Sequence, residues 1–285
     1  MKNYLSLIKF SHTIFALPFA IVGFYLALMI GNFEFNLQKL FAIILCMFFA
    51  RSAAMAFNRY IDRDIDAKNP RTQIREIPAG IVSAKNALMF TILCCIAFII
   101  TTYFINTLCF YLSPIALLII LGYSYTKRFT YWCHLVLGLG LSLAPLGAFL
   151  AVTNEFHVIP IFFSVAVLCW VSGFDIIYSL QDENFDREMK LYSMPTRFGG
   201  EKALLLSRML HFFSASSILL AGYFLKANSL YWIGALIFIG LLIYQHTIVK
   251  ANNLSRVNAA FFTTNGLASI LFSIFFVLNY YFYIF

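Results

Sequence analysis

Two acidic clusters with the same internal spacing interrupt an otherwise apolar chain. Asp62 and Asp66 are four residues apart, and so are Asp182 and Asp186, which follow 120 residues later. Residues four apart share one face of a helix, so each pair presents its carboxylates together. Carboxylate oxygens are the ligands that Mg²⁺ prefers, with phosphate oxygens completing its octahedron. Two such faces brought together therefore predict a magnesium site that binds a diphosphate.

Neighbouring side chains extend both faces at helical spacing. Asn58 precedes the first pair by four residues and adds an amide oxygen, whereas Asp64 points to another side of the same helix. Asp175 and Tyr178 precede the second pair and are expected to contact the substrate. The predicted metal ligands all offer oxygen and are Asn58, Asp62, Asp66, Asp182 and Asp186. The four aspartates of this set are also the predicted catalytic residues.

Four basic residues are predicted to bind the diphosphate. Lys127 and Arg128 directly follow an apolar run, while Arg71 and Arg75 lie in the loop after the first cluster. Cationic side chains form strong hydrogen bonds with phosphate and stabilise the charge on a departing pyrophosphate. For Lys127 and Arg128 the alternative is a topology anchor, and for Arg71 and Arg75 it is structural ion pairing.

Taken singly, each acidic cluster also fits a solvated loop with local ion pairs, such as Asp62 with Arg63 or Asp186 with Arg187. The repetition of the spacing behind two apolar runs favours a shared site instead. Of the five histidines, only His12 is expected near that site. The six cysteines lie in apolar segments without a C-x-x-C or Cys/His pattern, which indicates buried hydrophobic side chains rather than redox or zinc chemistry.

The composition indicates an integral membrane protein. Hydrophobic residues make up 62% of the 285 residues and charged residues 11%, whereas soluble domains have about 45–50% and about 25%. Long continuous apolar runs predict helices rather than a β-barrel. We expect an all-α membrane fold in a single domain, residues 1–285, with nine transmembrane helices. They are predicted at about 12–31, 39–57, 86–105, 108–126, 131–152, 158–180, 203–225, 229–249 and 258–283.

The distribution of Lys and Arg predicts the orientation. When the N-terminus and the loops after the even-numbered spans are placed on one side, only Lys39 and Lys226 of the 20 basic residues fall on the other. Basic residues favour the cytoplasmic side. The N-terminus and both acidic clusters are therefore expected there, in a multi-pass protein of the inner (cytoplasmic) membrane. The same asymmetry accounts for the net charge of +8 without a nucleic-acid partner.

The motifs resemble those of a known enzyme family. Asn58-Arg-x-x-Asp62-x-x-x-Asp66 resembles the first aspartate-rich motif of the UbiA superfamily of intramembrane aromatic prenyltransferases, and Tyr178-x-x-Gln-Asp182-x-x-x-Asp186 resembles the second. The stretch 69–80 and Tyr125-x-x-Arg128 resemble two further elements of that family.

One departure points to a branch of the family. Arg59 stands where the family often has aspartate, and the branch that resembles 4-hydroxybenzoate polyprenyltransferases of quinone biosynthesis commonly carries such an arginine. The resemblance implies a Mg²⁺-dependent transfer of a polyprenyl chain from its diphosphate to an aromatic acid, with release of diphosphate. The acid implied is 4-hydroxybenzoate, a naphthoate or a related hydroxyaryl acid, in ubiquinone or menaquinone biosynthesis. The implied partners are a polyprenyl diphosphate, an aromatic acid acceptor and membrane lipid.

Two other functions would use the same acidic pairs. A cation transporter would need ionisable groups near the middle of the membrane, where the predicted spans are nearly free of charge and Asp175 is the deepest acid. A lipid-linked phosphotransferase would bind the same metal but would leave a phosphate on its product. Release of pyrophosphate therefore distinguishes it from a prenyltransferase.

Overall fold

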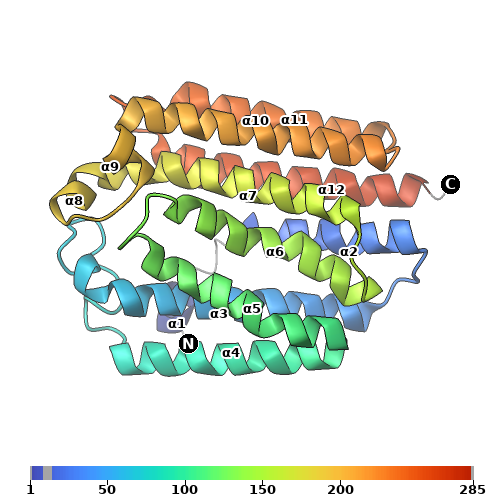
Figure 1. Ribbon diagram of the computed structural model, residues 1–285, viewed down its shortest axis with the longest axis horizontal. Helices are drawn as coiled ribbons and strands as arrows, with labels where there is room; N and C mark the ends of the chain where they lie inside the picture. Colours follow the sequence, from blue (N-terminus) through green and yellow to red (C-terminus); the bar gives the residue numbers. More distant parts are fainter. Residues whose placement is uncertain (1, 9–14, 284–285) are drawn as a thin grey trace.

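Helices form the regular structure of the residues that the computed structural model describes, 2–8 and 15–283 (Figure 1). In chain order they are α1 (Lys2–Leu7), α2 (Leu17–Gly31), α3 (Leu37–Asp66), α4 (Ala84–Ile105), α5 (Thr107–Thr126), α6 (Cys133–Thr153), α7 (Val158–Ser179), α8 (Glu183–Glu188), α9 (Met194–Phe198), α10 (Gly200–Phe224), α11 (Ser229–Ile248) and α12 (Asn265–Tyr283). A 3₁₀ turn, Leu180–Asp182, joins α7 to α8, and a π-helical turn, Ala259–Thr264, precedes α12.

The long helices confirm the expected all-α membrane fold. Eight of the described helical segments are long and apolar enough to cross a membrane, and the shorter α2 is apolar as well. Together they occupy the nine segments predicted from the sequence, with most ends shifted by a few residues. Residues 12–14 of the first predicted span lie outside the described residues. The largest difference is at α3, which continues nine residues beyond the predicted end at 57 and carries the first acidic cluster.

A single residue separates α4 from α5. Asn106 is extended, with φ −168°, and its side-chain oxygen accepts a hydrogen bond from the Cys109 N–H at 2.8 Å. Its Nδ2 donates to the Leu150 carbonyl of α6, also at 2.8 Å. Asn106 therefore ends one helix, caps the next and fixes this turn against α6.

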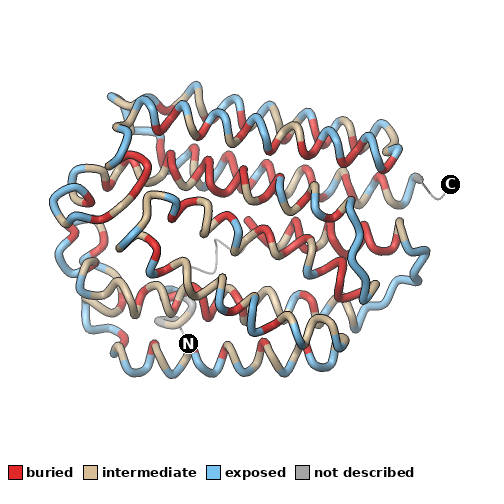
Figure 2. The backbone as a smooth tube through the Cα atoms, viewed as in Figure 1, coloured by how far each residue is buried: buried red, intermediate tan, exposed pale blue. Residues whose placement is uncertain are grey.

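The helices lie side by side along the long axis of the molecule, with α7 at the centre (Figure 1). α7 packs against both α6 and α10, and α2 packs against α6. Figure 2 shows α7 as mostly buried and α4 as largely exposed. The aromatic core includes Phe19, Trp170, Phe238 and Phe272. Trp170 Nε1 donates to Asn265 Oδ1 at 2.7 Å, so its polar N–H is satisfied inside this core.

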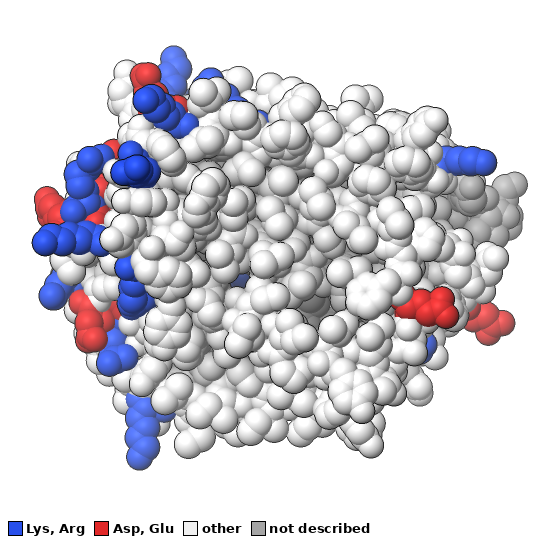
Figure 3. All heavy atoms as spheres, viewed as in Figure 1, with Lys and Arg blue, Asp and Glu red and all other residues white. Residues whose placement is uncertain are grey.

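Charged side chains gather at one end of the molecule. In Figure 3 most of the visible Lys, Arg, Asp and Glu lie at the left end, where Figure 1 places α8, α9 and the loop after α3. The middle of this face is nearly free of charge, and many large hydrophobic side chains of α4 and α5 are exposed. An apolar belt next to a charged end is the surface expected of a protein in lipid. Both acidic clusters belong to the charged end.

Gly138 allows α6 to approach α7 closely. A Cβ at this position would lie 2.5 Å from the Leu168 carbonyl oxygen and 2.3 Å from Ser172 Oγ. Ser172 Oγ donates to the Leu168 carbonyl at 2.7 Å and to the His134 carbonyl, in the first turn of α6, at 3.1 Å. These contacts hold the beginning of α6 against the part of α7 that leads into the second acidic cluster.

Candidate active site

A cavity of about 710 Å³ lies among α3, α5, α6 and α7. Its wall at the charged end holds polar side chains from both motifs, and along α3 the wall runs from Ile43 to Asp66. That stretch corresponds to about 35 Å of helix at about 1.5 Å per residue. Away from the motifs the wall is largely apolar, with Phe98, Leu112 and Leu150 among its side chains. The cavity therefore joins a charged end to an apolar passage.

The first motif occupies the last turns of α3. Asn58, Asp62 and Asp66 share the face that lines the cavity, and Asn58 Nδ2 donates to Asp62 Oδ2 at 2.9 Å. Asp64 points away, and 81% of its side chain is exposed, next to Arg63. The first cluster is thus helical, as its spacing predicts.

The second motif departs from the single helix that its spacing predicts. α7 ends at Ser179, and the 3₁₀ turn Leu180–Asp182 intervenes before α8. A 3₁₀ helix has three residues per turn, whereas an α-helix has 3.6. The 3₁₀ turn therefore rotates the side chains that follow it away from the α-helical stripe. Asp182 lines the cavity, whereas Asp186 is fully buried against Lys127 and is not part of the cavity wall. The expected stripe from Asp175 to Asp186 is therefore wrong at its far end.

Each aspartate of the two motif pairs forms an ion pair with one of the four predicted phosphate-binding residues. The pairs are Asp62–Arg128 at 2.9 Å, Asp66–Arg75 at 2.7 Å, Asp182–Arg71 at 2.5 Å and Asp186–Lys127 at 2.7 Å. The structure thus brings the predicted metal ligands and the predicted phosphate-binding residues together. Carboxylates that face a common cavity repel one another, and these basic side chains offset the repulsion.

The local ion pairs of the loop alternative do not form. Arg63 lies next to Asp64 rather than Asp62, and Arg187 pairs with Glu183 rather than Asp186. The partners of the motif aspartates come instead from the loop between α3 and α4 and from the end of α5. The clusters are therefore joined by tertiary contacts and not by neighbours in sequence.

Lys127 and Arg128 have different positions at the end of α5. Lys127 lines the cavity, whereas Arg128 lies outside its wall and donates to the Ser124 and Ile61 carbonyls, both at 2.9 Å. Burial acts to lower the pKa of the Lys127 ammonium, but the Asp186 carboxylate outweighs burial and holds that pKa above its usual value. Lys127 is therefore a charged group at neutral pH, and Arg128 also ties α5 to α3.

Arg71 connects the loop after α3 to the second motif. Besides Asp182, its guanidinium donates to the Tyr178 hydroxyl at 3.1 Å. Asn69, from the same loop, donates to Asp182 Oδ1 at 3.2 Å. The loop is thereby held over the charged end of the cavity, next to Tyr178 and Asp182, which are predicted to bind substrate and metal.

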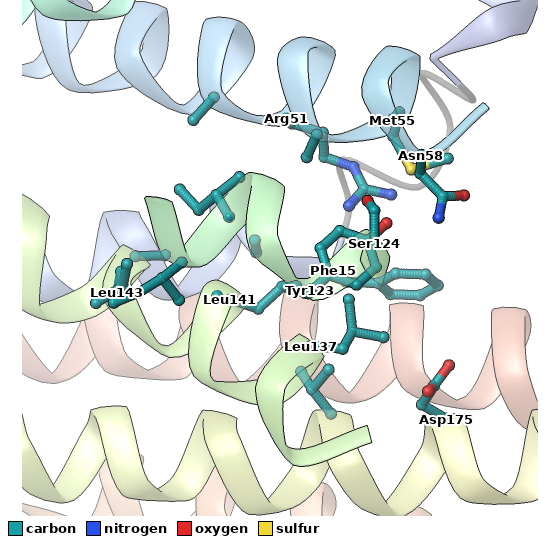
Figure 4. Close-up of a pocket in the computed structure, with 18 of the residues that line it drawn as sticks. Phe15, Arg51, Met55, Asn58, Tyr123, Ser124, Leu137, Leu141, Leu143 and Asp175 are labelled. Carbon is teal, nitrogen blue, oxygen red and sulfur yellow. The ribbon is translucent and has the colours of Figure 1, made fainter. Parts of the chain in front are cut away.

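Arg51 is a site residue that the sequence reasoning missed. It projects from α3 towards Tyr123 and Ser124 of α5, as Figure 4 shows, and all three line the cavity. Arg51 Nε and Ser124 Oγ are buried without a hydrogen-bond partner, and within the described residues no carboxylate forms an ion pair with Arg51. Arg51 lies seven residues before Asn58, two turns along the same face, so the helical stripe itself offered the signal.

His134 is the second residue missed. It lies in the first turn of α6 and lines the cavity, and its Nδ1 lies 2.7 Å from Oδ2 of Asp175. Figure 4 shows Asp175 on α7, across the cavity from Arg51. The expectation that only His12 lies near the site is wrong for His134, and His12 itself lies outside the described residues. Asp175, the partner of His134, is 41 positions away in sequence, so residue spacing does not predict this pair.

The sequence profile of the UbiA prenyltransferase family matches residues 16–279. The chain belongs to this family. Curated relatives of this UbiA chain include the 4-hydroxybenzoate octaprenyltransferase of Vibrio cholerae serotype O1, which is 31% identical over 231 residues, or 81% of each chain. The protein of that name from Francisella tularensis subsp. mediasiatica is 28% identical over 79% of this chain and 78% of its own. The family match confirms the expectation of an enzyme that transfers prenyl groups.

Solved UbiA structures share this fold over nearly the whole chain. A UbiA homolog from Aeropyrum pernix K1, without ligand, has a TM-score of 0.81 at 27% identity, covering 96% of this chain and 98% of its own. A UbiA homolog from Archaeoglobus fulgidus bound to GPP and Mg²⁺ has a TM-score of 0.73 at 21% identity, covering 98% and 99%. The second likeness concerns the fold alone.

The donor set of the UbiA motifs fits Mg²⁺. Asn58 and the four motif aspartates offer only oxygen, which Mg²⁺ prefers over sulfur and nitrogen. Among the described residues, no three His, Cys, Asp or Glu side chains are already grouped as a metal cluster. The reason lies in the ion pairs, because each carboxylate is turned to a basic side chain. To share a metal ion, these predicted ligands would have to exchange partners.

Proposed function

We propose that this enzyme transfers a polyprenyl chain from polyprenyl diphosphate to an aromatic acid of the 4-hydroxybenzoate type and releases diphosphate, as a step of ubiquinone biosynthesis. The observation that carries the proposal is the continuity of one cavity from the charged end to the apolar passage. A diphosphate suits the first part and a polyprenyl chain the second. The names of the curated relatives support the acceptor. A naphthoate of menaquinone biosynthesis is the alternative acceptor.

The diphosphate lies, in this proposal, where the ion pairs now lie. Arg71, Arg75 and Lys127 line the cavity and would turn from their aspartates to phosphate oxygens. The oxygen ligands of a metal would be Asn58, Asp62, Asp66, Asp182 and Asp186, the last only after Lys127 has left it. Mg²⁺, when bound, stabilises the negative charge that grows on the departing diphosphate.

Arg51 is the residue that we assign to the carboxylate of the acceptor. A guanidinium whose Nε is buried without a partner is costly, and an aromatic acid would supply the missing charge through a two-pronged hydrogen bond. Ser124 Oγ, which is also unpaired, lies next to it (Figure 4). The acceptor would then lie between Arg51 and Asp175, in the section of cavity that separates diphosphate from apolar passage.

The reaction balances with groups of this chain. The allylic C–O bond breaks, and its electron pair leaves with the diphosphate. A ring carbon next to the hydroxyl forms the new C–C bond, and the proton of that carbon passes to a base. Asp62, Asp66 and Asp182 are assigned to the metal in this proposal, so Asp175 is the remaining cavity-lining aspartate and the one that we assign as the base.

We place the enzyme in the inner (cytoplasmic) membrane with its charged end towards the cytoplasm. The Lys and Arg asymmetry between the two sides supports this orientation, and most charges visible in Figure 3 lie at the end that carries the motifs. Soluble aromatic acids and diphosphate would then exchange directly with the cytoplasm.

Product masses test the proposal. Membranes that contain the protein are incubated with Mg²⁺, a polyprenyl diphosphate and a panel of aromatic acids, and pyrophosphate release is followed. We expect a product whose mass is that of the acid plus the prenyl group less one hydrogen. 4-Hydroxybenzyl alcohol, which lacks the carboxylate, should be a poor acceptor because it leaves Arg51 unpaired. A phosphate-bearing product, or no product with any acid, would contradict the proposal.

A further inference from the structure

The hydrogen bonds of His134 define its protonation. Met194 N–H donates to His134 Nε2 at 3.3 Å, and a backbone N–H is only a donor, so Nε2 carries no proton. The proton of the ring is therefore on Nδ1, which lies 2.7 Å from Asp175 Oδ2 and donates to it. These contacts fit an imidazole that is protonated at Nδ1, with Asp175 as its carboxylate acceptor.

Three elements hold this imidazole in place. Its backbone belongs to the first turn of α6, where Ser172 of α7 donates to its carbonyl. Its Nε2 receives the first N–H of α9, a helix whose beginning is fixed by the Ser193–Thr196 capping box. Only 3% of the side chain is exposed. The ring cannot turn without breaking a contact to α7 or α9, so it holds Asp175 in one orientation.

Asp175 differs from the other carboxylates in the cavity wall. Asp62, Asp66 and Asp182 each face an arginine, whereas Asp175 faces His134 and leaves 24% of its side chain exposed to the cavity. In the described part of the chain no group donates to its Oδ1. One oxygen is therefore held by the imidazole, and the other is available to a ligand.

We propose that His134 is a positioning residue, which orients Asp175 so that Oδ1 takes the proton released when the acceptor ring is alkylated. The inference rests on the proposed function. The allylic C–O electrons leave with diphosphate, the ring carbon bonds to the prenyl carbon, and the electrons of its C–H bond restore the aromatic ring. The proton passes to Asp175, which becomes a carboxylic acid. His134 keeps its own proton throughout and relays none.

Two substitutions separate positioning from plain packing. His134→Met has similar bulk but no donor, and we expect kcat to fall at least about tenfold, within the range of acid–base contributions, while KM for polyprenyl diphosphate stays within about twofold. His134→Gln carries an amide NH₂ donor and a carbonyl acceptor, so it can replace both hydrogen bonds. It should recover most of the lost kcat. Equal kcat in His134→Met and wild type would overturn the proposal.

Double variants and a matched histidine complete the test. Asp175→Asn removes the base, so adding His134→Met to it should lower kcat by less than twofold, whereas independent effects would multiply and contradict the proposal. His157, which caps the opposite end of α7 through its Nδ1, serves as control. His157→Met should leave kcat unchanged, and melting temperatures identify any variant that is merely unfolded.

A spectroscopic measurement keeps the proposal testable if His134→Met does not fold. In wild-type protein with ¹⁵N-labelled histidine, the His134 resonances, assigned by their loss in His134→Gln, should show a protonated Nδ1 and a bare Nε2 at pH 7. An imidazolium with both nitrogens protonated would refute the tautomer. Absence of wild-type turnover with every aromatic acid would instead refute the proposed function, so the two failures are distinguishable.

Discussion

Asp62 and Asp64 lie two positions apart on α3 in opposite surroundings. Asp62 faces the cavity, and Asp64 is exposed. We predict that Asp62→Asn lowers turnover by at least about 100-fold, the scale of losing one group that stabilises transition-state charge. Asp64→Asn should stay within about threefold of wild type. Initial rates, normalised to the amount of protein in the membrane, check both. Comparable losses in the two variants would show that the cavity face of α3 is wrongly assigned.

At the scale of residues, spacing predicts the groups that share one helix and misses those whose partners come from elsewhere. Asn58, Asp62 and Asp66 could be found because a single helix displays them. His134 could not be found, because it is linked to the site only through its contact with Asp175 on another helix. Arg51 was within reach, two turns before Asn58, but a basic residue near a span end is more often a topology anchor.

At the scale of elements, the close contact between α6 and α7 depends on Gly138, which has no side chain. Gly138→Ala would place a Cβ 2.5 Å from the rigid Leu168 carbonyl, and such overpacking costs about 1–3 kcal/mol. Gly147, on the same helix, has no atom within 4 Å of a built Cβ. We predict that Gly138→Ala lowers the melting temperature in detergent and that Gly147→Ala does not, since alanine favours helix by up to about 1 kcal/mol. A melting temperature of Gly138→Ala equal to that of wild type would mean that α6 and α7 can move apart without cost to stability.

The positions of the long helices were predictable, and the bend in the second motif was not. A membrane demands about 20 apolar residues per span, which leaves a strong signal in the sequence. The 3₁₀ turn Leu180–Asp182 contains neither glycine nor proline, so its local sequence is compatible with a continuing helix. Asp182 contacts Asn69 and Arg71, which lie in a loop that is distant in sequence. Such tertiary contacts leave no periodic pattern in the sequence.

At the scale of the whole molecule, the metal is expected to serve the reaction and not the fold. We predict that EDTA abolishes turnover, that Mg²⁺ restores it, and that the melting temperature changes by no more than about 2 °C. The reason is that all four motif aspartates have basic partners within the chain itself. Activity assays and thermal denaturation of the same samples measure both effects. Full turnover in metal-free buffer would contradict the proposed use of Mg²⁺, and unfolding by EDTA would contradict a reaction-only role.

The ion pairs at the charged end of the cavity also affect the proposed release of diphosphate. In the proposed mechanism, Arg71, Arg75 and Lys127 each return to the aspartate that they now face as soon as diphosphate moves away. In the proposed site, each motif aspartate thus competes with diphosphate for the same basic side chain, and the free energy of re-forming the ion pairs would lower the affinity for diphosphate. A site built from unpaired cations would hold pyrophosphate tightly and become inhibited as it accumulates. Because each of these basic side chains has an aspartate of this chain as an alternative partner, we expect rapid release of diphosphate and a new cycle.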